Sequence, residues 1–550
     1  MIPIGYAFRR LAGVARGWAR IVEAPPDVRV ERDVEVTMRD GVMLRVNVYR
    51  PDGDAKHPVI LSAHPYGKDA LPQKRLFGWK KNIQYRLMRS PKPARFSALT
   101  GWEAPDPGYW VPRGYVLVNC DLRGFHRSEG EGSLFSREQG RDLFDVVEWA
   151  AGRPWSTGKV GMCGVSYLAI AQWFAAAERP PHLSAICPWE GFSDPYRDLC
   201  YPGGVREAGF VPFWSGMLRS ERRNRDDLEK EQLARPLLDE WWAAHTPDLE
   251  RIDVPALICG SFSDQNVHTR GSFEAFRRIA SARKWLYTHR DGKWAAFYSE
   301  EGVAFQTRFF DHFLKGDENG MEQVPPVRLE VRDSGNVVHE VREEREWPLA
   351  RTRWTPLYLH GDGTLRVGAA SPDILTFDAA RGCAQFTWTV PADTELSGPM
   401  KLRLHVEARG TDDLLLFAGV RKLRGGREVF FEGSYGWGRD LVTRGWLAVS
   451  HRRMDQTRSE AWRPWLTHDR EEKLVPEAVV PVEIELLPSA TLFRTGDLLR
   501  LDIQGRYFYP RNPLIGQFPA GYLKSETGTA VLHLGGTRDA HLLIPVIPRK

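Results

Sequence analysis

The sequence predicts two folded units: an α/β domain with a mainly parallel sheet, followed by an all-β sandwich or jelly roll. Over residues 30–315, short apolar runs alternate with stretches of helical period, as in parallel sheets that helices cover on both faces. Beyond the turn-rich stretch 317–327, the helical period nearly vanishes and apolar residues alternate with polar ones. The length of 550 residues also exceeds what one hydrophobic core serves well.

The elements of the α/β domain follow from short patterns in chain order. Residues 34–51 predict a hairpin that turns at Asp40 and Gly41, and "HPVILSAHPYG" and "GYVLVNCDLRG" predict short strands that each end at a glycine. "SREQGRDLFDVVEWAAGRPW" predicts a helix, "KVGMCG" a strand and "YLAIAQWFAAAE" a second helix. Three further strands are expected at "LSAICPW", "PALICGSFSD" and "RKWLYTH". The alternation of strands and helices is interrupted over about 190–251, which predicts a cap inserted over an active site.

The β domain is predicted from short strands of period two with turns between them. They are "VRLEVRD", "PLYLHGDG", "LTFD", "QFTWTV", "KLRLHVEA", "LLLFAGVRKL", "WLAVSHRR", "PVEIELLP", "LLRLDIQG" and "AVLHLG". We expect the α/β domain to span 30–320 and the β domain 321–550. In residues 1–29 arginines interrupt every apolar run, so we expect an amphipathic helical extension there rather than a signal peptide.

Composition restricts the classes of function. The 76 basic and 71 acidic side chains are interleaved, without a run of Lys and Arg typical of nucleic-acid binding, so no nucleic-acid partner is expected. No stretch of about 18 apolar residues occurs, so we expect no membrane span. The six cysteines are widely spaced without a C-x-x-C pair, which favours reduced thiols in a cytoplasmic protein over disulfides or a zinc site. We therefore expect neither a metal nor a cofactor.

The stretch "GKVGMCGVSYLAIAQWFAAAE" places Ser166 between an apolar strand and a helix of 3.6-residue period. Its core, "GVSYL", resembles the nucleophile elbow G-x-S-x-G, with Leu168 in place of the last glycine. An elbow needs small neighbours because the serine backbone is strained, and Gly164 and Ala169 are small. A serine in a glycine-rich turn is usually structural, but the strand-to-helix context favours a nucleophile here.

A nucleophilic serine needs a base, and an acid that orients the base. Asp264 follows the strand in "VPALICGSFSDQNVH", which is the place for the acid, although an Asx-turn or a helix cap also explains an aspartate there. His289 ends the next strand, "RKWLYTH", so we expect it to be the base. His268, four residues after Asp264, is the alternative base or a pocket residue. His312 lies in an amphipathic helix, which explains it without catalysis.

Two donors are expected to hold the oxyanion of a tetrahedral intermediate. The residue after the nucleophile normally gives a backbone N–H, and that residue is Tyr167. The loop after an early strand, "LSAHPYGKD", offers the phenol hydroxyl of Tyr66, with His64 as a helper. The position of this loop at a strand end, rather than its composition, supports the assignment.

Together these stretches resemble the serine hydrolase family that includes cocaine esterase, α-amino-acid ester hydrolases and Xaa-Pro dipeptidyl-peptidases. The matching segments run nearly from end to end and include "HPYGKD", "VLVNCDLRGFHRSEGE", "GMCGVSYLAIAQW", "FFDHFLKGDENG", "PVEIELLPSATLFRTGDLLRLDI" and "HLLIPVIP". The resemblance implies an α/β-hydrolase domain with a helical cap and a C-terminal galactose-binding-like jelly roll. It also implies Ser166 as nucleophile, Asp264 as acid, and Tyr66 and the Tyr167 N–H as oxyanion donors. Known members of this family have a Gly-Pro-Trp-x-His run after the strand that corresponds to "RKWLYTH", where this chain reads "LYTHRDGKW".

The sequence thus predicts hydrolysis of a small-molecule carboxylic ester or amide through an acyl-enzyme. A rival function is an aminopeptidase of Xaa-Pro type, which needs carboxylates near the cap for a substrate ammonium. Glu190, Asp194 and Asp198 are candidates, although solvated surface acids explain them equally well. A rival from another class is a binding protein with an idle hydrolase fold. The sequence leaves the oligomeric state open, and a homo-oligomer is one option.

Overall fold

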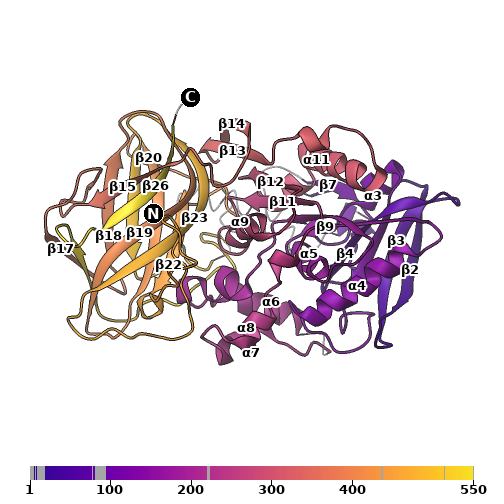
Figure 1. Cartoon of the computed structure of the whole chain (residues 1–550), viewed down its shortest axis with the longest axis horizontal. Helices are drawn as coiled ribbons and strands as arrows, with labels where there is room; N and C mark the ends of the chain where they lie inside the picture. The colour runs from indigo at the N-terminus through magenta and orange to yellow at the C-terminus, as the bar shows by residue number, and fades with distance from the viewer. Residues whose placement is uncertain are drawn as a thin grey trace.

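The computed structural model describes residues 5, 8, 11, 19–76, 78–80, 94–219, 223–434, 438–512 and 514–548. Figure 1 shows two lobes side by side, the α/β domain at the right and the β domain at the left. Most of the helix expected within residues 1–29 lies outside the described residues. The end of that segment is extended, because β1 (Arg20–Val22) pairs in parallel with β7 (Arg95–Ser97) and β2 already begins at Val28.

The α/β domain is built on one sheet, whose described strands follow the order β2-β3-β8-β4-β9-β10-β11-β12. The strands from β8 to β12 are parallel, and β2 and β3 form the predicted hairpin at one edge, with Gly41 at a φ of 86° in its turn. The bounds are β2 (Val28–Thr37), β3 (Met43–Pro51), β4 (His57–His64), β8 (Val116–Asp121), β9 (Ser156–Val165), β10 (Leu183–Trp189), β11 (Ala256–Ser261) and β12 (Lys284–His289).

Helices cover this sheet on two sides. The first pair, α4 and α5, pack against each other and on β4 and β9. The second pair, α11 and the π-helical turn η5, lies over the same strands, where the missing Cβ of Gly161 leaves room for Phe310 and Leu314. Strands shielded on both faces are mainly apolar, and every residue of β8 and β11 is buried. The bounds are α3 (Pro107–Trp110), η1 (Val111–Arg113), α4 (Arg137–Ala151), α5 (Tyr167–Ala177), α9 (Thr269–Arg278), α10 (Lys293–Phe297), α11 (Glu300–Phe310) and η5 (Asp311–Lys315).

Short helices between β10 and β11 occupy the segment expected to form a cap. They gather at the lower side of the α/β domain in Figure 1, next to the β domain. Asp227 caps one of them, since its side chain accepts the N–H groups of Glu229 and Lys230. The bounds are η2 (Pro195–Cys200), η3 (Pro202–Gly204), α6 (Phe210–Leu218), α7 (Leu228–Ala234), α8 (Glu240–Ala244) and η4 (Leu249–Arg251).

The β domain is a sandwich of two antiparallel sheets. In one sheet β19 pairs with β23, β25 and β26, and the latter two lead on to β17 and β15. In the other the order is β18-β24-β20, with β21 and β22 also paired to β20. Buried side chains such as Phe386, Leu402 and Ile503 form the core. The bounds are β15 (Arg353–Leu359), β16 (Leu365–Arg366), β17 (Asp373–Asp378), β18 (Cys383–Thr389), β19 (Thr394–Arg409), β20 (Leu415–Arg424), β21 (Arg427–Val429), β22 (Thr443–Ala448), β23 (Val480–Phe493), β24 (Leu498–Gln504), β25 (Thr529–Leu534) and β26 (His541–Ile547).

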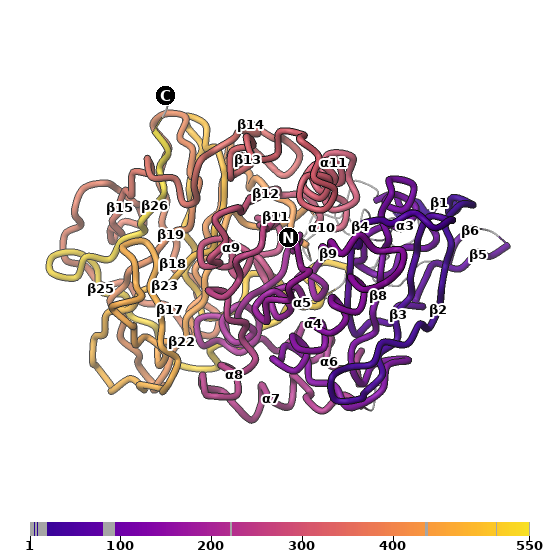
Figure 2. Tube along the Cα trace, turned by 45° about the vertical axis from the view of Figure 1, so that its right-hand side comes forward, coloured from indigo at the N-terminus to yellow at the C-terminus, as the bar shows by residue number. Residues whose placement is uncertain are grey.

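One strand expected in the β domain extends the sheet of the α/β domain. The run "VRLEVRD" forms β13 (Val327–Ser334), which pairs in parallel with β12 and antiparallel with β14 (Val337–Glu344). A further pairing joins Arg332 of β13 to Thr491 of β23, so the first sheet continues into the sandwich. Figure 2 shows β12, β13 and β14 together at the junction of the two lobes. The expected boundary near residue 320 therefore falls just before a strand that both domains share.

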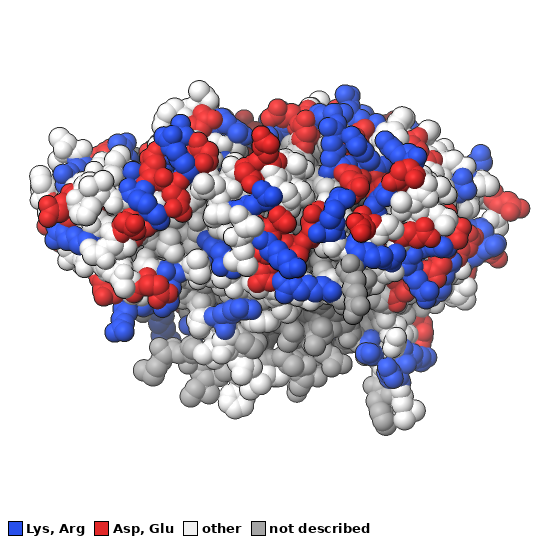
Figure 3. Space-filling model, turned by 90° about the horizontal axis from the view of Figure 1, so that it is seen from below, with Lys and Arg blue, Asp and Glu red and all other residues white. Residues whose placement is uncertain are grey.

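The structure shows where the charged side chains and the cysteines lie. Acidic and basic side chains are intermixed over the face shown in Figure 3. All six cysteines carry free thiols, and five of them are buried. Among the described residues, no helix has the length and apolar character needed to cross a membrane.

Candidate active site

Ser166 lies at the sharp turn between β9 and α5. Its φ of 61° and ψ of −118° are strained for a serine, which is the backbone state expected of a nucleophile elbow. A Cβ on Gly164, whose φ is 150°, would lie 2.4 Å from the Cβ of Leu168, and one on Gly191 would lie 2.8 Å from that of Ala169. Glycines at these two positions therefore allow the turn to close, as the motif requires.

The Ser166 hydroxyl is bonded to His268 and not to His289. Its Oγ lies 2.9 Å from His268 Nε2, the only side-chain partner it has among the described residues. His268 returns to the serine through a tight turn, in which the N–H groups of residues 267–269 all donate to the carbonyl of Asp264. The structure thus brings the nucleophile together with the histidine that the sequence offered as the alternative base.

The surroundings of His268 fix how its imidazole is protonated. The backbone N–H of Phe192 donates to Nδ1 at 3.2 Å, so the neutral ring carries its proton on Nε2 and directs it at Ser166. The Phe192 ring also stacks on the imidazole, with centroids 5.7 Å apart. Burial, and then the charge of Lys293, holds the pKa of His268 well below its usual range, so the ring is neutral at pH 7.

His289 has partners of its own. Its Nε2 donates to Glu190 Oε1 at 3.0 Å, and its Nδ1 accepts the N–H of Asp291 at 3.1 Å. Both ring nitrogens are therefore engaged, and in the described part of the chain no hydrogen bond joins this ring to Ser166. This placement differs from the expectation that His289 is the base, because the end of β12 directs the ring at the residue that follows β10.

Asp264 is fully buried and pairs with a lysine. Its Oδ2 accepts from Lys293 Nζ at 3.1 Å and lies 3.9 Å from His268 Nε2, whereas Oδ1 has no partner among the described side chains. The carboxyl thus approaches the nitrogen that faces Ser166, and not the Nδ1 that an orienting acid holds in a catalytic triad. Lys293 belongs to "RDGKW", the run that departs from the familiar family pattern.

Two more buried carboxyls lie near Lys293. Glu103 accepts the Trp294 indole N–H at 3.0 Å, and both Glu103 and Glu190 keep one oxygen without a described partner. Burial raises the pKa of Glu103 to about 8 and also raises that of Glu190. Burial alone lowers the pKa of Lys293, but the carboxyl groups of Asp264, Glu103 and Glu190 outweigh it and raise that pKa. Lys293 is therefore an ammonium ion in an acidic setting. No sequence motif marks Glu103 or Lys293.

The two residues expected to supply the oxyanion donors are in contact through their rings. Tyr167 is the first residue of α5, so its N–H has no helical carbonyl one turn earlier to bond. The Tyr66 hydroxyl accepts the Trp214 indole N–H at 3.1 Å and can donate its own proton elsewhere. Burial, and then Glu103, raises the pKa of Tyr66 well above its usual value, so the phenol stays protonated. The Tyr66 and Tyr167 rings meet edge to face with centroids 6.2 Å apart.

His64 supports the Tyr66 loop from the interior. The ring is fully buried, its Nδ1 accepts the Tyr66 N–H at 3.2 Å, and it stacks on the Tyr66 ring. Burial lowers the pKa of His64 to about 3, so this imidazole is neutral. Its described contacts give it a role in shaping the loop.

Aromatic side chains from two helices and two loops pack around the nucleophile turn. Trp214 of α6 stacks on Tyr167 and on Phe135, with centroids 6.1 Å and 5.6 Å apart, and Phe135 also meets Phe192. Because Trp214 comes from the cap, the cap contributes directly to the surroundings of the oxyanion donors. Sequence patterns assign Phe135 to no element, and only the fold shows its place here.

The three carboxyls considered for a substrate ammonium are engaged within the fold. Asp194 caps η2, Asp198 accepts from Arg270 at 2.8 Å, and Glu190 holds the imidazole described above. In the residues that the structure describes, none of the three is hydrogen-bonded to Ser166 or to the histidine beside it.

Glu190, Cys259 and His289 offer ligand atoms within 4.8 Å of one another, the one such group among the described residues. A metal-bound imidazole donates its other N–H to an acceptor. Here the N–H of Asp291 donates to Nδ1 of His289, so Nε2 keeps the proton and donates it to Glu190. The trio is therefore a hydrogen-bonded pair beside a buried thiol, in which His289 Nε2 carries a proton and offers no lone pair to a metal ion.

Comparisons with known proteins match both domains. Residues 40–292 match the family model of the X-Pro dipeptidyl-peptidase (S15 family), and residues 319–543 match that of the X-Pro dipeptidyl-peptidase C-terminal non-catalytic domain. A solved CocE/NonD family hydrolase from Staphylococcus aureus is 39% identical, with a TM-score of 0.90 over 95% of this chain and 94% of that chain. Cocaine esterase from Rhodococcus sp. is 27% identical over 94% of this chain and 99% of its own length. An α-amino-acid ester hydrolase, 17% identical with a TM-score of 0.69, shares the fold over 96% of this chain and 98% of that chain.

Proposed function

Because the chain belongs to the CocE/NonD family of hydrolases and is a serine hydrolase, we propose that it cleaves a carboxylic ester through an acyl-enzyme on Ser166. One observation carries the proposal: the Ser166 hydroxyl, at a strained strand-to-helix turn, lies 2.9 Å from His268 Nε2. A neutral imidazole at hydrogen-bond distance from a serine hydroxyl is the base–nucleophile pair of acyl transfer.

The roles follow from the positions of the groups. Ser166 Oγ attacks the substrate carbonyl while His268 Nε2 takes its proton, and the imidazolium then protonates the leaving alcohol. The N–H of Tyr167 and the hydroxyl of Tyr66 hold the oxyanion. A water molecule deprotonated by His268 then attacks the acyl-enzyme, and the imidazolium returns that proton to Ser166 Oγ as the acyl–oxygen bond breaks and the carboxylic acid leaves.

The imidazole must carry its own proton on Nδ1 when Nε2 accepts the proton of the serine. The Phe192 N–H donates to Nδ1 in the structure, so we assign this arrangement to the resting enzyme and expect that N–H to leave Nδ1 during turnover. Asp264 Oδ2, 3.9 Å from Nε2, is close enough to stabilise the imidazolium by its charge, although it does not hold Nδ1. Lys293 weakens that stabilisation because it already pairs with the same carboxylate.

A small-molecule ester is the substrate class that we favour. Cocaine esterase, which aligns along almost its whole length, is named for an ester, whereas the family model is named for an Xaa-Pro peptidase. The acids expected to hold a peptide ammonium are already engaged, Asp198 by Arg270 and Glu190 by His289. We therefore expect short acyl esters to be cleaved faster than an X-Pro-anilide. The free thiols of all six cysteines support a cytoplasmic location.

The substitution Ser166→Ala tests the proposal. We expect hydrolysis of a p-nitrophenyl ester to fall by several powers of ten and labelling by a fluorophosphonate probe to vanish, while urea unfolding stays as in the wild type. Ser272→Ala is the matched control, because Ser272 is also buried and its hydroxyl donates to the Gly191 carbonyl at 3.1 Å. Unchanged turnover in Ser166→Ala would refute the nucleophile. A wild-type protein that neither labels nor cleaves any ester would favour the idle-fold binding protein.

A further inference from the structure

The turn that carries Asp264 and His268 is held from outside its own domain. Gln265 and Asn266 lie between the two in sequence, and their amides contact the β domain. Gln265 Nε2 donates to the Val442 carbonyl at 3.0 Å, and Asn266 Nδ2 donates to Gln517 Oε1 at 3.3 Å. Within the α/β domain, the one hydrogen bond from either side chain to a described residue is the long contact of Gln265 Nε2 with the Phe262 carbonyl, 3.4 Å.

One guanidinium of the β domain bonds both amides. Arg444 of β22 donates from Nε to Gln265 Oε1 at 3.1 Å and from Nη1 to Asn266 Oδ1 at 3.2 Å. Its side chain is 0% exposed, and Asp440 supplies the counter-charge. Because a guanidinium is a rigid planar fork, it fixes the spacing of two successive side chains on the turn. The Tyr507 hydroxyl also donates to Asn266 Oδ1, at 2.7 Å.

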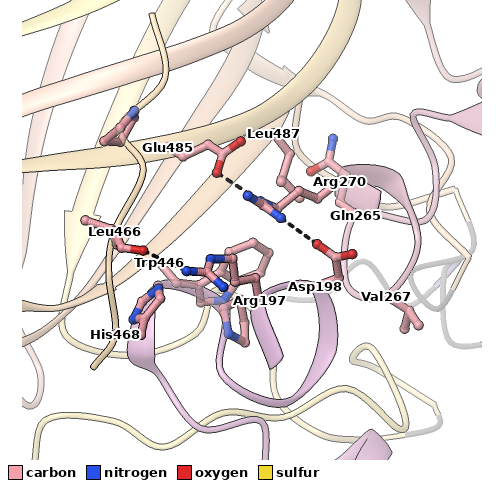
Figure 4. Close-up of a pocket in the computed structure, with 13 residues that line it drawn as sticks. Arg197, Asp198, Gln265, Val267, Arg270, Trp446, Leu466, His468, Glu485 and Leu487 are labelled. Atoms are coloured by element: carbon pink, nitrogen blue, oxygen red, sulfur yellow. Dashed lines mark hydrogen bonds and ion pairs between the residues drawn. The ribbon is translucent and has the colours of Figure 1, made fainter. Parts of the chain in front are cut away.

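The β domain also holds the turn at its two ends. Before it, the Ser434 N–H donates to the Ser263 carbonyl at 2.7 Å. After it, Arg270 of α9 lies between Asp198 and Glu485 of β23, at 2.8 Å and 3.0 Å, as Figure 4 shows. The cavity in that view holds about 40 Å³, room for a few water molecules and too little for a substrate. This part of the domain junction is therefore closely packed and holds the turn in place.

We propose that Arg444, a residue of the β domain, positions His268 against Ser166; this inference rests on the proposed role of His268 as the base. The position of His268 depends on Arg444 through the hydrogen bonds of the turn. Asp264 and His268 are four residues apart, and Arg444 fixes the side-chain amides of the two residues that follow Asp264, Gln265 and Asn266. The matching family model calls its domain non-catalytic, and Arg444 indeed touches no reacting atom. It is a positioning residue that affects the reaction only through His268.

The test removes the guanidinium without leaving a buried charge behind. Arg444→Met alone strands Asp440 in the interior and endangers folding, so the variant is Arg444→Met/Asp440→Asn. The matched control is Arg463→Met/Glu274→Gln. Arg463 is a second buried arginine of the β domain, and it pairs with Glu274 of α9 across the same junction. In the described residues it makes no hydrogen bond to the turn 263–268.

We expect kcat of the Arg444→Met/Asp440→Asn variant to fall about a hundredfold, with KM changed less than about threefold, because a displacement near 1 Å is enough for such a loss. The acidic limb of kcat/KM should move to higher pH, since a loosened turn lets water reach the imidazole and relieves the burial that lowers its pKa. Arg444→Lys should restore part of kcat, because an ammonium reaches one amide oxygen but not both in a fixed fork.

The control pair should keep the wild-type kcat and pH profile even if its unfolding midpoint falls. Wild-type kcat and pH profile in the Arg444 variant, or an equal loss of kcat in the control, would overturn the positioning role. His268→Gln separates this outcome from failure of the proposed function. Full activity in His268→Gln would overturn the base assignment itself. An inactive His268→Gln beside a fully active Arg444 variant would overturn the positioning role alone.

Discussion

Exchanging each of two histidines for glutamine in turn, His268→Gln and His289→Gln, separates the base from a structural histidine. His268 supplies the only described side-chain partner of the nucleophile, 2.9 Å from its hydroxyl. A general base contributes about 10² to 10⁴ in rate, and triad members more. We expect His268→Gln to lower kcat/KM at least about a thousandfold. A thousandfold loss corresponds to a barrier about 4 kcal/mol higher.

The His289→Gln variant should lose stability and keep the chemistry. His289 Nε2 donates to Glu190 Oε1 at 3.0 Å, and the other oxygen of Glu190 has no described partner. Losing one buried hydrogen bond of this kind costs about 1–3 kcal/mol. Burial raises the pKa of Glu190 and His289 opposes that rise, so the pKa climbs further in the variant.

The pH dependence of unfolding gives a second readout for His289→Gln. A carboxyl with a raised pKa binds its proton more tightly in the folded state, so the stability it contributes is lost as pH rises through the folded pKa. The deficit of the variant should therefore be larger at pH 8 than at pH 6 in urea unfolding. A p-nitrophenyl ester assay completes the comparison. The reasoning is refuted if His289→Gln loses three powers of ten in kcat/KM while His268→Gln retains its activity.

Three further outcomes follow from the site. Burial and Lys293 lower the pKa of His268, so kcat/KM should keep its plateau down through pH 6.5. Lys293→Met should move the acidic limb of kcat/KM to higher pH. A limb centred above pH 7 in the wild type contradicts this reasoning. Tyr66→Phe removes one oxyanion donor, so kcat should fall about 10²- to 10³-fold with little change in KM, and an unchanged kcat excludes the role. Gly164→Ala places a Cβ 2.4 Å from that of Leu168, at a backbone φ of 150°, and should cost at least about 3 kcal/mol in urea unfolding; a wild-type midpoint contradicts the steric reasoning.

The nucleophile turn was predictable because its signals are local. A strand, a glycine two residues before Ser166 and a helix of clear period lie within about twenty consecutive residues, and the structure has all three. The histidine that contacts Ser166 was not predictable by the same reasoning. His268 follows the parallel strand β11 and His289 ends the parallel strand β12, and which of them reaches Ser166 depends on the turn after β11. Three N–H groups on the Asp264 carbonyl turn His268 back to the serine, and sequence period does not encode that turn.

The fold class was likewise predictable from hydrophobic period, whereas the limits of each sheet were not. Alternation in "VRLEVRD" identified β13, but period two is the same whether a strand joins a parallel or an antiparallel neighbour. Glu103 and Lys293 show a related limit. Each stands in a segment without a recognisable motif, and only tertiary packing brings them near the same aspartate.

Because β13 pairs with strands of both domains, its position in the sequence affects how the chain folds during synthesis. Everything needed for the nucleophile turn precedes residue 317, yet β12 has an exposed edge until β13 emerges from the ribosome and pairs with it. Translation from residue 317 to the end of β13 at Ser334 takes on the order of one to a few seconds at usual rates. During that interval the first half carries an unpaired edge strand of the kind that promotes aggregation. A chain cut before β13 would keep that edge permanently and should need a chaperone to stay in solution.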